Sequence, residues 1–313
     1  MKERQYAGDY LDDSTHSRKA TGLKRQIIEG SRQFLERRFF AEVEDMITKN
    51  AREAQIGGVP TVINKIRGYI RVRDARKDLL PDAIEAQNDG QGYCWVLIFF
   101  LLRCGFVTEA ARYVTEDPHF RSLDMKFVTY LTTFATNRRL PRNMQQKING
   151  EYQQRLRNAP ENTVDPYRMA CYKIIGRCDL SRRTLEGVRQ DVEDWMWLQF
   201  SLAREDDHAE EVASDVFGLD DIQTDISEIG AMFTKGQDGA GGYGTYFLLQ
   251  ILGGMFEQAV AYLGTHAPVT AVHFAIALAY YGLLRVSDFY VSGEEPCKCT
   301  RPFDLIHSLA SFV

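Results

Sequence analysis

Apolar residues recur at helical spacing along almost the whole chain. Between residues 23 and 50, five apolar side chains follow one another at steps of seven, four, four and three: Ile28, Leu35, Phe39, Val43 and Met46. This spacing places them on one face of a long amphipathic helix. Few segments alternate apolar and polar residues at period two, as a half-buried strand would. The pattern therefore predicts an all-α protein.

The same periodicity predicts a series of further helices. One of them carries five apolar residues on a single face: Phe120, Leu123, Phe127, Leu131 and Phe134. The others cover residues 61–77, 91–103, 108–115, 144–157, 166–177, 181–203, 221–233, 244–252, 255–263 and 268–284. Asp165 before Pro166 is typical of an N-cap followed by proline at the first helical position. Pro60 and Pro268 are expected at helix entrances in the same way.

Two stretches share the pattern of a helical hairpin, LLRCGFVTEAARYV and ILGGMFEQAVAYL. When they are aligned, the matching positions are Gly105 and Gly254, Ala110 and Ala259, and Tyr113 and Tyr262. A glycine lets the first helix end in the left-handed conformation, and a small alanine lets the second helix pack closely against it. No strict 34-residue period is present. We therefore expect an irregular α-solenoid of stacked antiparallel hairpins, in which these six residues have structural roles.

The last third of the chain is unusually apolar. Glu257 is the only formally charged residue between positions 240 and 284, so these helices are expected at the centre of the packing. A membrane span needs about 20 continuous apolar residues. Here Gly253, Gly254, Gly264 and Pro268 interrupt the stretch. Buried solenoid core is therefore favoured over a transmembrane segment.

Composition narrows the class of protein. The 313 residues are 44% hydrophobic and 26% charged, which is ordinary for a folded protein. The net charge of −5 and the pI near 5.8 give no cationic field for direct binding to nucleic acid.

The polar segment 1–22 lacks the apolar core of a secretory signal and is expected to be flexible. Six cysteines occur without a CxxC spacing, so we expect free thiols in a reducing compartment.

Charged residues are distributed unevenly. Residues 191–228 hold thirteen acidic side chains against Arg204 alone, whereas residues 65–77 hold six basic side chains against Asp74 alone. Two interpretations stay open for both runs: solvated helix faces, or surfaces that dock a partner of opposite charge.

Several motifs suggest chemistry without the context that the chemistry needs. Three glycines match the GxGxxG pattern of a dinucleotide site: Gly239, Gly241 and Gly244. A predicted helix precedes them, whereas a dinucleotide site requires a strand at that place. Two acidic clusters resemble the Mg²⁺-binding motifs of terpenoid synthases, yet lie only fourteen residues apart: Asp206, Asp207 and Glu210, and Asp220, Asp221 and Asp225. The six histidines show no ligand spacing. We therefore expect no catalytic residues, no metal, no cofactor and no enzymatic activity.

Three segments of the chain resemble a known family. They are KRQIIEGSRQFLERRFF at residues 24–40, PDAIEAQNDGQGYCWVLIFFLLRCGFVTEAARYV at residues 81–114, and YGTYFLLQILGGMFEQAVAYLGTHAPVTAVHFAIALAYYGLLRVSD at residues 243–288. All three are similar to the nucleoporin-interacting component family, the linker scaffold nucleoporin of the inner ring of the nuclear pore. The resemblance extends from about residue 18 to residue 288.

The resemblance implies a function and a place in the cell. The family's fold is an irregular helical stack that folds back on itself, and its role is to bridge pore subcomplexes. Its members bind flexible linker nucleoporins and inner-ring scaffold subunits, and so support transport of protein and mRNA at the nuclear envelope. No catalytic residues of the family exist to carry over. The implied organisation is a flexible segment 1–22, a solenoid domain 23–288 and a divergent tail 289–313.

Two features of the sequence depart from the family. Family members carry a coiled-coil region upstream and further solenoid downstream, so channel recruitment is not implied for this chain. After residue 288 the sequence FYVSGEEPCKCTRPFDLIHSLASFV no longer resembles the family. A solenoid that stops there leaves an apolar face uncovered, and we expect the isolated chain to be marginally soluble. The alternative to a pore scaffold is a cytosolic α-solenoid adaptor or vesicle-coat component with the same hairpins and other partners.

Overall fold

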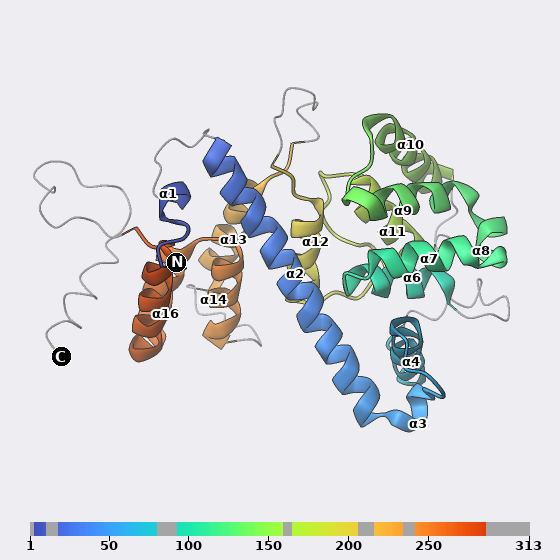
Figure 1. Ribbon diagram of the computed structural model, residues 1–313, viewed down its shortest axis with the longest axis horizontal. Coiled ribbons are helices and arrows are strands. Elements are labelled where there is room, and N and C mark those ends of the chain that lie inside the picture. The colour runs from blue at the N-terminus through green and yellow to red at the C-terminus, as the bar shows by residue number, and fades with distance from the viewer. Residues whose placement is uncertain are drawn as a thin grey trace, which may run out of the picture. The chain divides into compact units, whose positions relative to one another are not determined.

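The computed structural model describes residues 3–10, 18–79, 93–158, 165–205, 216–233 and 242–285, and every regular element in these ranges is a helix (Figure 1). The helices are α1 (Ala7–Tyr10), α2 (Arg18–Lys49), α3 (Ala51–Ala54), α4 (Val62–Ala75), α6 (Cys94–Arg103), α7 (Val107–Glu116), α8 (Pro118–Leu123), α9 (Met125–Asn137), α10 (Arg142–Asn158), α11 (Pro166–Gly176), α12 (Val192–Leu202), α13 (Leu219–Phe233), α14 (Gly242–Leu252), α15 (Phe256–His266) and α16 (Pro268–Tyr281). The predicted all-α class is confirmed.

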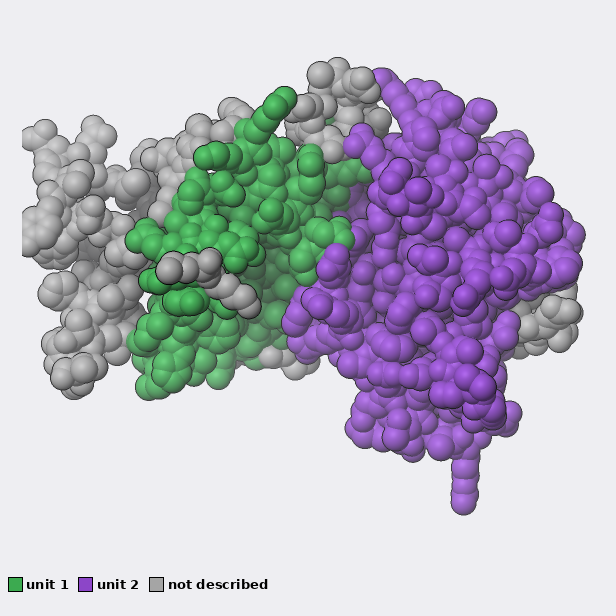
Figure 2. Space-filling view, in the orientation of Figure 1, with its two compact units in different colours: residues 1–31, 203–211, 216–313 green, residues 32–202, 212–215 purple. Residues whose placement is uncertain are grey.

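The chain divides into two compact units, which Figure 2 colours separately. Unit 1 comprises residues 1–31, 203–211 and 216–313, and unit 2 comprises residues 32–202 and 212–215. Unit 1 therefore combines both ends of the chain, and unit 2 is a nearly continuous insertion between them. Helix α2 contributes its first part to unit 1 and its remainder to unit 2. The predicted boundaries at residues 22 and 288 stay predictions, and residues 289–313 lie outside the described part.

The core of unit 2 is built around α6, which is buried along its whole length. It packs against α4, α7 and α11. Trp95 on α6 contacts the rings of Phe120 and Phe127, with ring centroids 5.0 and 4.8 Å apart. Both phenylalanines are fully buried, so truncation of either to alanine would cost about 3–5 kcal/mol. This aromatic contact joins α6 to α8 and α9, and α9 carries part of the polar site described below.

Helix α11 begins as the sequence predicts. Asp165 is its N-cap and Pro166 occupies the first helical position, while the Asp165 carboxylate accepts hydrogen bonds from the backbone N–H groups of Tyr167 (2.8 Å) and Arg168 (3.3 Å). Pro268 likewise begins α16. Pro60 lies one residue before the N-cap of α4, which is Thr61.

The helix predicted through residues 120–134 is in fact two helices. Asp124 separates α8 from α9 and caps α9, because its carboxylate accepts a hydrogen bond from the N–H of Phe127 at 3.1 Å. The periodic apolar face continues across the break, since Phe120 and Phe127 are both buried. Apolar spacing alone could not reveal the break, because the spacing is the same on both sides of it. The break arises from Asp124, whose short polar side chain competes for the backbone N–H groups.

The helix predicted for residues 181–203 is also shorter than expected. Only Val192–Leu202 is helical, and the preceding residues form an irregular segment that buries Leu185 and Val188. Asp191 accepts a hydrogen bond from the N–H of Asp194 at 2.7 Å and so fixes the start of α12. Side chains supply hydrogen-bond partners to some of its carbonyls: Gln190 donates to that of Leu185 at 2.8 Å, and Gln199 donates to that of Arg183 at 3.0 Å.

Helix α16 contradicts the expectation of a fully central apolar third. Ala271 is its one buried residue, whereas Val269 is 72% exposed and Ile276 63% exposed. An apolar composition all round predicts burial only when neighbouring helices cover every face. In unit 1, α16 packs against α15, and α15 packs in turn against α14.

The amino-terminal segment contacts the end of α16. The N–H groups of Arg4 and Tyr6 donate to the carbonyls of Tyr280 (2.6 Å) and Tyr281 (3.0 Å). The Tyr10 hydroxyl donates to Glu257 at 2.7 Å, and the Tyr10 ring packs against Phe256. These contacts satisfy carbonyl groups that the last turn of α16 leaves without helical partners.

Candidate functional site

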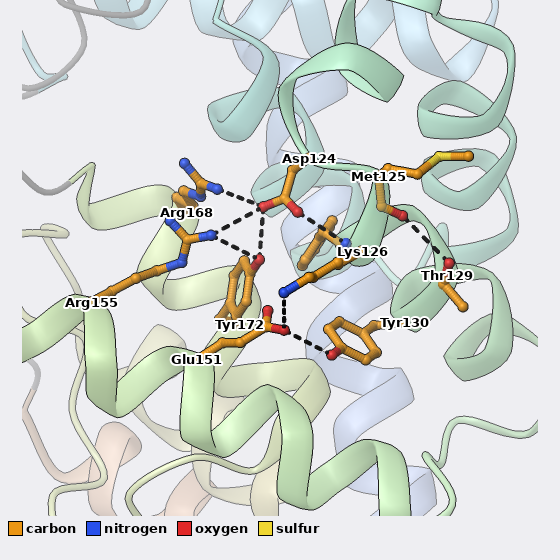
Figure 3. A network of polar contacts seen from close by, with 10 residues as sticks. Asp124, Met125, Lys126, Thr129, Tyr130, Glu151, Arg155, Arg168 and Tyr172 are labelled. Carbon is orange, nitrogen blue, oxygen red and sulfur yellow. Dashed lines mark hydrogen bonds and ion pairs between the residues drawn. The ribbon is translucent and has the colours of Figure 1, made fainter.

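A cluster of connected polar side chains in the described part of unit 2 joins α9, α10 and α11 (Figure 3). Asp124 lies at its centre, because the break between α8 and α9 places this residue at the start of α9. Arg155 comes from α10, and Arg168 and Tyr172 come from successive turns of α11. The three helices are therefore connected by charged contacts beside an aromatic core.

Asp124 has nearly all of its acceptor positions occupied. Its Oδ2 accepts hydrogen bonds from Arg168 Nη2 at 2.5 Å and from the Tyr172 hydroxyl at 2.7 Å. Arg155 Nη2 lies 3.6 Å from the same oxygen, which is an ion pair without a close hydrogen bond. Burial, and then the bond to Asp124, raise the pKa of Tyr172, so its phenol stays protonated and donates.

Glu151 forms a second centre on α10. Its Oε1 receives Lys126 Nζ at 3.1 Å and the Tyr130 hydroxyl at 3.2 Å. Burial and the nearby Glu151 raise the pKa of Tyr130 to about 12. Both acids of the cluster are thus neutralised by bases from a different helix, which makes the cluster an interhelical tie.

A hollow of about 480 Å³ opens beside this cluster. Its lining residues are Leu123, Asp124, Met125, Lys126, Glu151, Gln154, Arg155, Asn158 and Arg168. Seven of the nine lining residues are polar or charged, and the other two are the exposed apolar residues Leu123 and Met125. The volume falls within the range of about 300–1,000 Å³ that is usual for ligand sites.

The acids around the hollow are paired with bases and phenols. Its two acids are held by arginine, lysine and tyrosine, and no cysteine or histidine lines it. The described cysteines are buried elsewhere, and burial raises the pKa of each thiol, for example that of Cys94 to about 11. A thiol with a raised pKa is a poor nucleophile.

The predicted hairpin at Gly105 lies between α6 and α7. Gly105 has a φ of +82°, its N–H donates to Leu102, and the next N–H, of Phe106, donates back to Leu101 at 2.8 Å. This is the hydrogen-bond pattern of a glycine C-cap. Ala110 is fully buried five residues later. Tyr113 is half-buried, and the Arg67 guanidinium lies 5.8 Å from its ring centroid.

The predicted hairpin at Gly254 repeats this geometry between α14 and α15. Gly254 has a φ of +72°, its N–H donates to Ile251, and the N–H of Met255 donates back to Gln250 at 2.9 Å. Ala259 is fully buried. Tyr262 packs edge-on against Tyr246, with ring centroids 4.8 Å apart. The structure does not bring these three residues to the polar hollow, and neither does it bring the Gly105 group there.

The other motifs singled out in the sequence do not form a site in the described residues. Asp220 pairs with Lys24 at 2.6 Å, and Asp221 accepts from the N–H of Gly218, so this acidic cluster caps and anchors α13. Gly244 lies inside α14. The remaining members lie outside the described residues: Asp206, Asp207, Glu210, Gly239 and Gly241. No group of three metal-binding side chains occurs in the residues that the structure describes.

The two charge runs take part in contacts between helices. From the basic run, Lys65 pairs with Glu44, and Arg71 donates to the carbonyl of Gln55 at 3.0 Å. From the acidic run, Asp194 pairs with the buried Arg103 at 2.7 Å. These members are therefore not simply solvated, as one interpretation held. Within the described ranges, no helix is long and apolar enough to cross a membrane.

Sequence reasoning missed the Asp124 cluster entirely. Its members lie up to 48 positions apart, and no spacing rule joins them. One local signal was available: Asp124 is a typical N-cap residue inside the predicted helix, and Asp117 and Asp165 are N-caps of the same type before prolines. An aspartate at such a break predicts a helix start, and a helix start buried against neighbours needs charged partners.

The arrangement of antiparallel helix pairs with glycine turns defines an α-solenoid. The fold is closely similar to the crystal structure of Chaetomium thermophilum Nic96 SOL, with a TM-score of 0.86 and 50% identity over 94% of this chain and 42% of that one. The family model described as Nup93/Nic96 matches residues 1–310. The chain belongs to the Nup93/Nic96 family.

Curated relatives agree with this assignment. The chain is 51% identical to nucleoporin NIC96 of Chaetomium thermophilum over 94% of its own length, and 31% identical to nucleoporin NIC96 of Saccharomyces cerevisiae over 83%. It is 29% identical to nuclear pore complex protein Nup93 of Xenopus tropicalis over 87%. It spans 27%, 30% and 32% of the lengths of these three proteins.

Proposed function

We propose that this chain is a scaffold segment of the nuclear pore complex. The observation that carries the proposal is the family match over residues 1–310, together with a shared fold at 50% identity. Its place is then the pore at the nuclear envelope, since the relatives are named as nucleoporins and nuclear pore complex proteins. By serving as a fixed element of the pore, it supports nucleocytoplasmic transport of protein and mRNA.

The partners in this proposal are other nucleoporins, namely inner-ring scaffold subunits and flexible linker segments. Stacked hairpins suit this role because each pair of helices adds a surface groove at a fixed place along the stack. The proposal gives the chain no enzymatic role. The polar groups of the described hollow support this, since they pair acids with bases between helices and leave no activated nucleophile.

Affinity capture from nuclear extract tests the proposal. The full chain carries a small tag at one end, and a second bait carries the tag alone, so that nonspecific proteins can be subtracted. At moderate salt, mass spectrometry is expected to find inner-ring and linker nucleoporins enriched on the tagged chain. A fluorescent fusion of the same chain is expected at the nuclear rim in intact cells.

Other outcomes would overturn the proposal. Enrichment of vesicle-coat or other cytosolic proteins, with a diffuse cytosolic fusion, would favour the adaptor alternative. Enrichment of chaperones alone would show that the chain has no docking surface of its own.

A further inference from the structure

We infer that the hollow between α9, α10 and α11 is a docking pocket for an acidic side chain, aspartate or glutamate, that stands beside an aliphatic residue in an extended segment of a partner protein. The inference rests on the proposed function only in that both require a protein partner. Three independent observations support it: regional charge, the state of two arginines, and an exposed apolar rim.

The stretch of chain that contains α9, α10 and the start of α11 is basic in an acidic chain. Residues 121–168 contain nine lysines and arginines against four acidic residues, whereas the whole chain has a net charge of −5. At the pocket itself, Lys126, Arg155 and Arg168 outnumber Asp124 and Glu151. A local excess of positive charge attracts and orients an acidic partner, because complementary fields steer encounter and fix register.

The two arginines keep donor capacity that the described residues do not use. Arg168 is the one residue of α11 that is not buried, so it is the point at which this core helix reaches the pocket. Arg155 lies 3.6 Å from Asp124 and 3.4 Å from the Tyr172 hydroxyl, at the long limit of polar contact. The Nε atoms of both are buried without a hydrogen-bond partner among the described residues, so a ligand would meet the terminal nitrogens of the partly exposed Arg155.

Arg155 can bind a ligand while Asp124 keeps its hydrogen bonds to α11. Arg168 and Tyr172 hold Asp124 by short hydrogen bonds, so Asp124 stays paired if Arg155 turns toward an incoming carboxylate. The Arg155 guanidinium is only partly buried, with 34% of its side chain exposed. A guanidinium presents a planar fork that matches a carboxylate with two parallel hydrogen bonds.

The rim supplies the aliphatic half of the recognition. Met125 is 55% exposed and Leu123 is 37% exposed, and both line the pocket next to the charged groups. Methionine is flexible and adapts its shape to different apolar partners. An aliphatic residue next to the acid would cover these two side chains and remove them from water.

The same walls disfavour a nucleic acid. Asp124 and Glu151 line the pocket together with the bases. A phosphate backbone would place successive negative charges against these acids. A peptide carries one charged side chain flanked by neutral N–H and C=O groups, so its carboxylate can meet Arg155 without placing further negative charges against the two acids.

The experiment selects ligands without assuming a sequence. A library of random heptapeptides, displayed so that no peptide has a free carboxyl terminus, is panned on the immobilised full chain. Selected sequences are expected to contain aspartate or glutamate next to leucine, isoleucine, valine or methionine. The best peptide is then made in amidated form, and its affinity is measured by fluorescence anisotropy together with that of its glutamine or asparagine analogue.

Three variants separate the pocket from the rest of the surface. Arg155→Gln is expected to weaken binding about tenfold or more, because a charge-assisted contact is lost. Met125→Ala acts on the apolar rim and is expected to weaken it several-fold. Arg157→Gln is the matched control: the same charge change on the same helix, at an exposed residue outside the lining, with affinity unchanged. Circular dichroism checks that each variant is folded.

The outcomes distinguish this inference from the proposed function. Selection without an acidic consensus, or a peptide that binds Arg155→Gln as well as the parent chain, would overturn the pocket while leaving capture of nucleoporins intact. Equal affinity for a twelve-nucleotide oligouridylate, lost in Arg155→Gln, would replace the peptide by RNA and also overturn it. Loss of nucleoporin capture with the peptide consensus retained would instead count against the pore scaffold.

Discussion

Gly105 offers a sharp test of how the hairpins are held, because its left-handed conformation and its close neighbour can be separated. With a φ of +82°, an alanine here carries a strain of about 1–2 kcal/mol. The new Cβ would also collide with the carboxylate of Glu36 on α2. Glu36 is buried and pairs with Arg32 (3.6 Å) and Arg138 (3.4 Å), so its displacement adds about 1–3 kcal/mol.

Gly105→Ala is therefore expected to lower the free energy of unfolding by about 2–5 kcal/mol. The matched control is Gly58→Ala, in the same unit. Gly58 has a φ of +78°, but a Cβ there would meet no atom within 4 Å, so only the strain of about 1–2 kcal/mol applies. The loss of unfolded-state entropy is the same for both substitutions and cancels in the comparison.

Urea unfolding followed by tryptophan fluorescence measures the change in stability of unit 2, where both glycines lie, because Trp95, Trp195 and Trp197 all belong to that unit. A larger loss in Gly105→Ala than in Gly58→Ala is expected. Equal losses in the two variants would refute the reasoning, since they would show that the approach of Glu36 to the turn adds nothing to stability.

Three further predictions concern the core and the caps. Arg103→Ala should lower the free energy of unfolding by about 3–5 kcal/mol, because it leaves the partly buried Asp194 without its base. Arg182→Ala removes a base from an exposed ion pair and should cost less than about 0.5 kcal/mol. The same fluorescence assay compares the two variants, and similar losses of stability would contradict the prediction. Ala259→Leu should cost about 1–3 kcal/mol by overpacking a fully buried position, whereas Ala277→Leu on the exposed side of α16 should be near neutral in urea unfolding followed by circular dichroism. Burial raises the pKa of Asp165 to about 6 from 3.8, so the folded state binds its proton more tightly and stability falls as the pH rises from about 4 to 6. Asp165→Asn keeps an acceptor at the N-cap, so the variant should gain on the parent chain by up to about 3 kcal/mol over this window, and a difference that does not change with pH would exclude the effect.

The hairpins could be predicted because their information is local. A glycine that ends one helix and an alanine five residues later are read within a single stretch, and both hairpins have the same hydrogen-bond pattern at the turn. Asp165 and Pro166 belong to the same class of signal. In each case the determining contacts lie within one or two turns of helix.

The polar cluster could not be predicted in the same way. Asp124 meets Arg168 and Tyr172 only after α9, α10 and α11 have packed, and each residue alone looks like an ordinary surface charge or core aromatic. The exposure of α16 was mispredicted for a related reason. Val269 and Ile276 are apolar, but whether a neighbouring helix covers them depends on the tertiary arrangement.

The contact between Tyr10 and Arg285 also bears on how the chain is made. The Arg285 guanidinium donates to the carbonyl of Tyr10 at 3.1 Å across 275 positions of sequence. Ribosomes add roughly 5–20 residues per second, so Arg285 is synthesised on the order of 15–55 seconds after Tyr10. Unit 2 is complete in sequence before α13–α16 emerge. During that interval the early part of α2 lacks the contacts that it makes in the finished fold, since Lys24 pairs with Asp220 on α13 and Ser31 donates to the carbonyl of Leu252 on α14. The start of α2 can therefore take its final place only after the last third of the chain has been made.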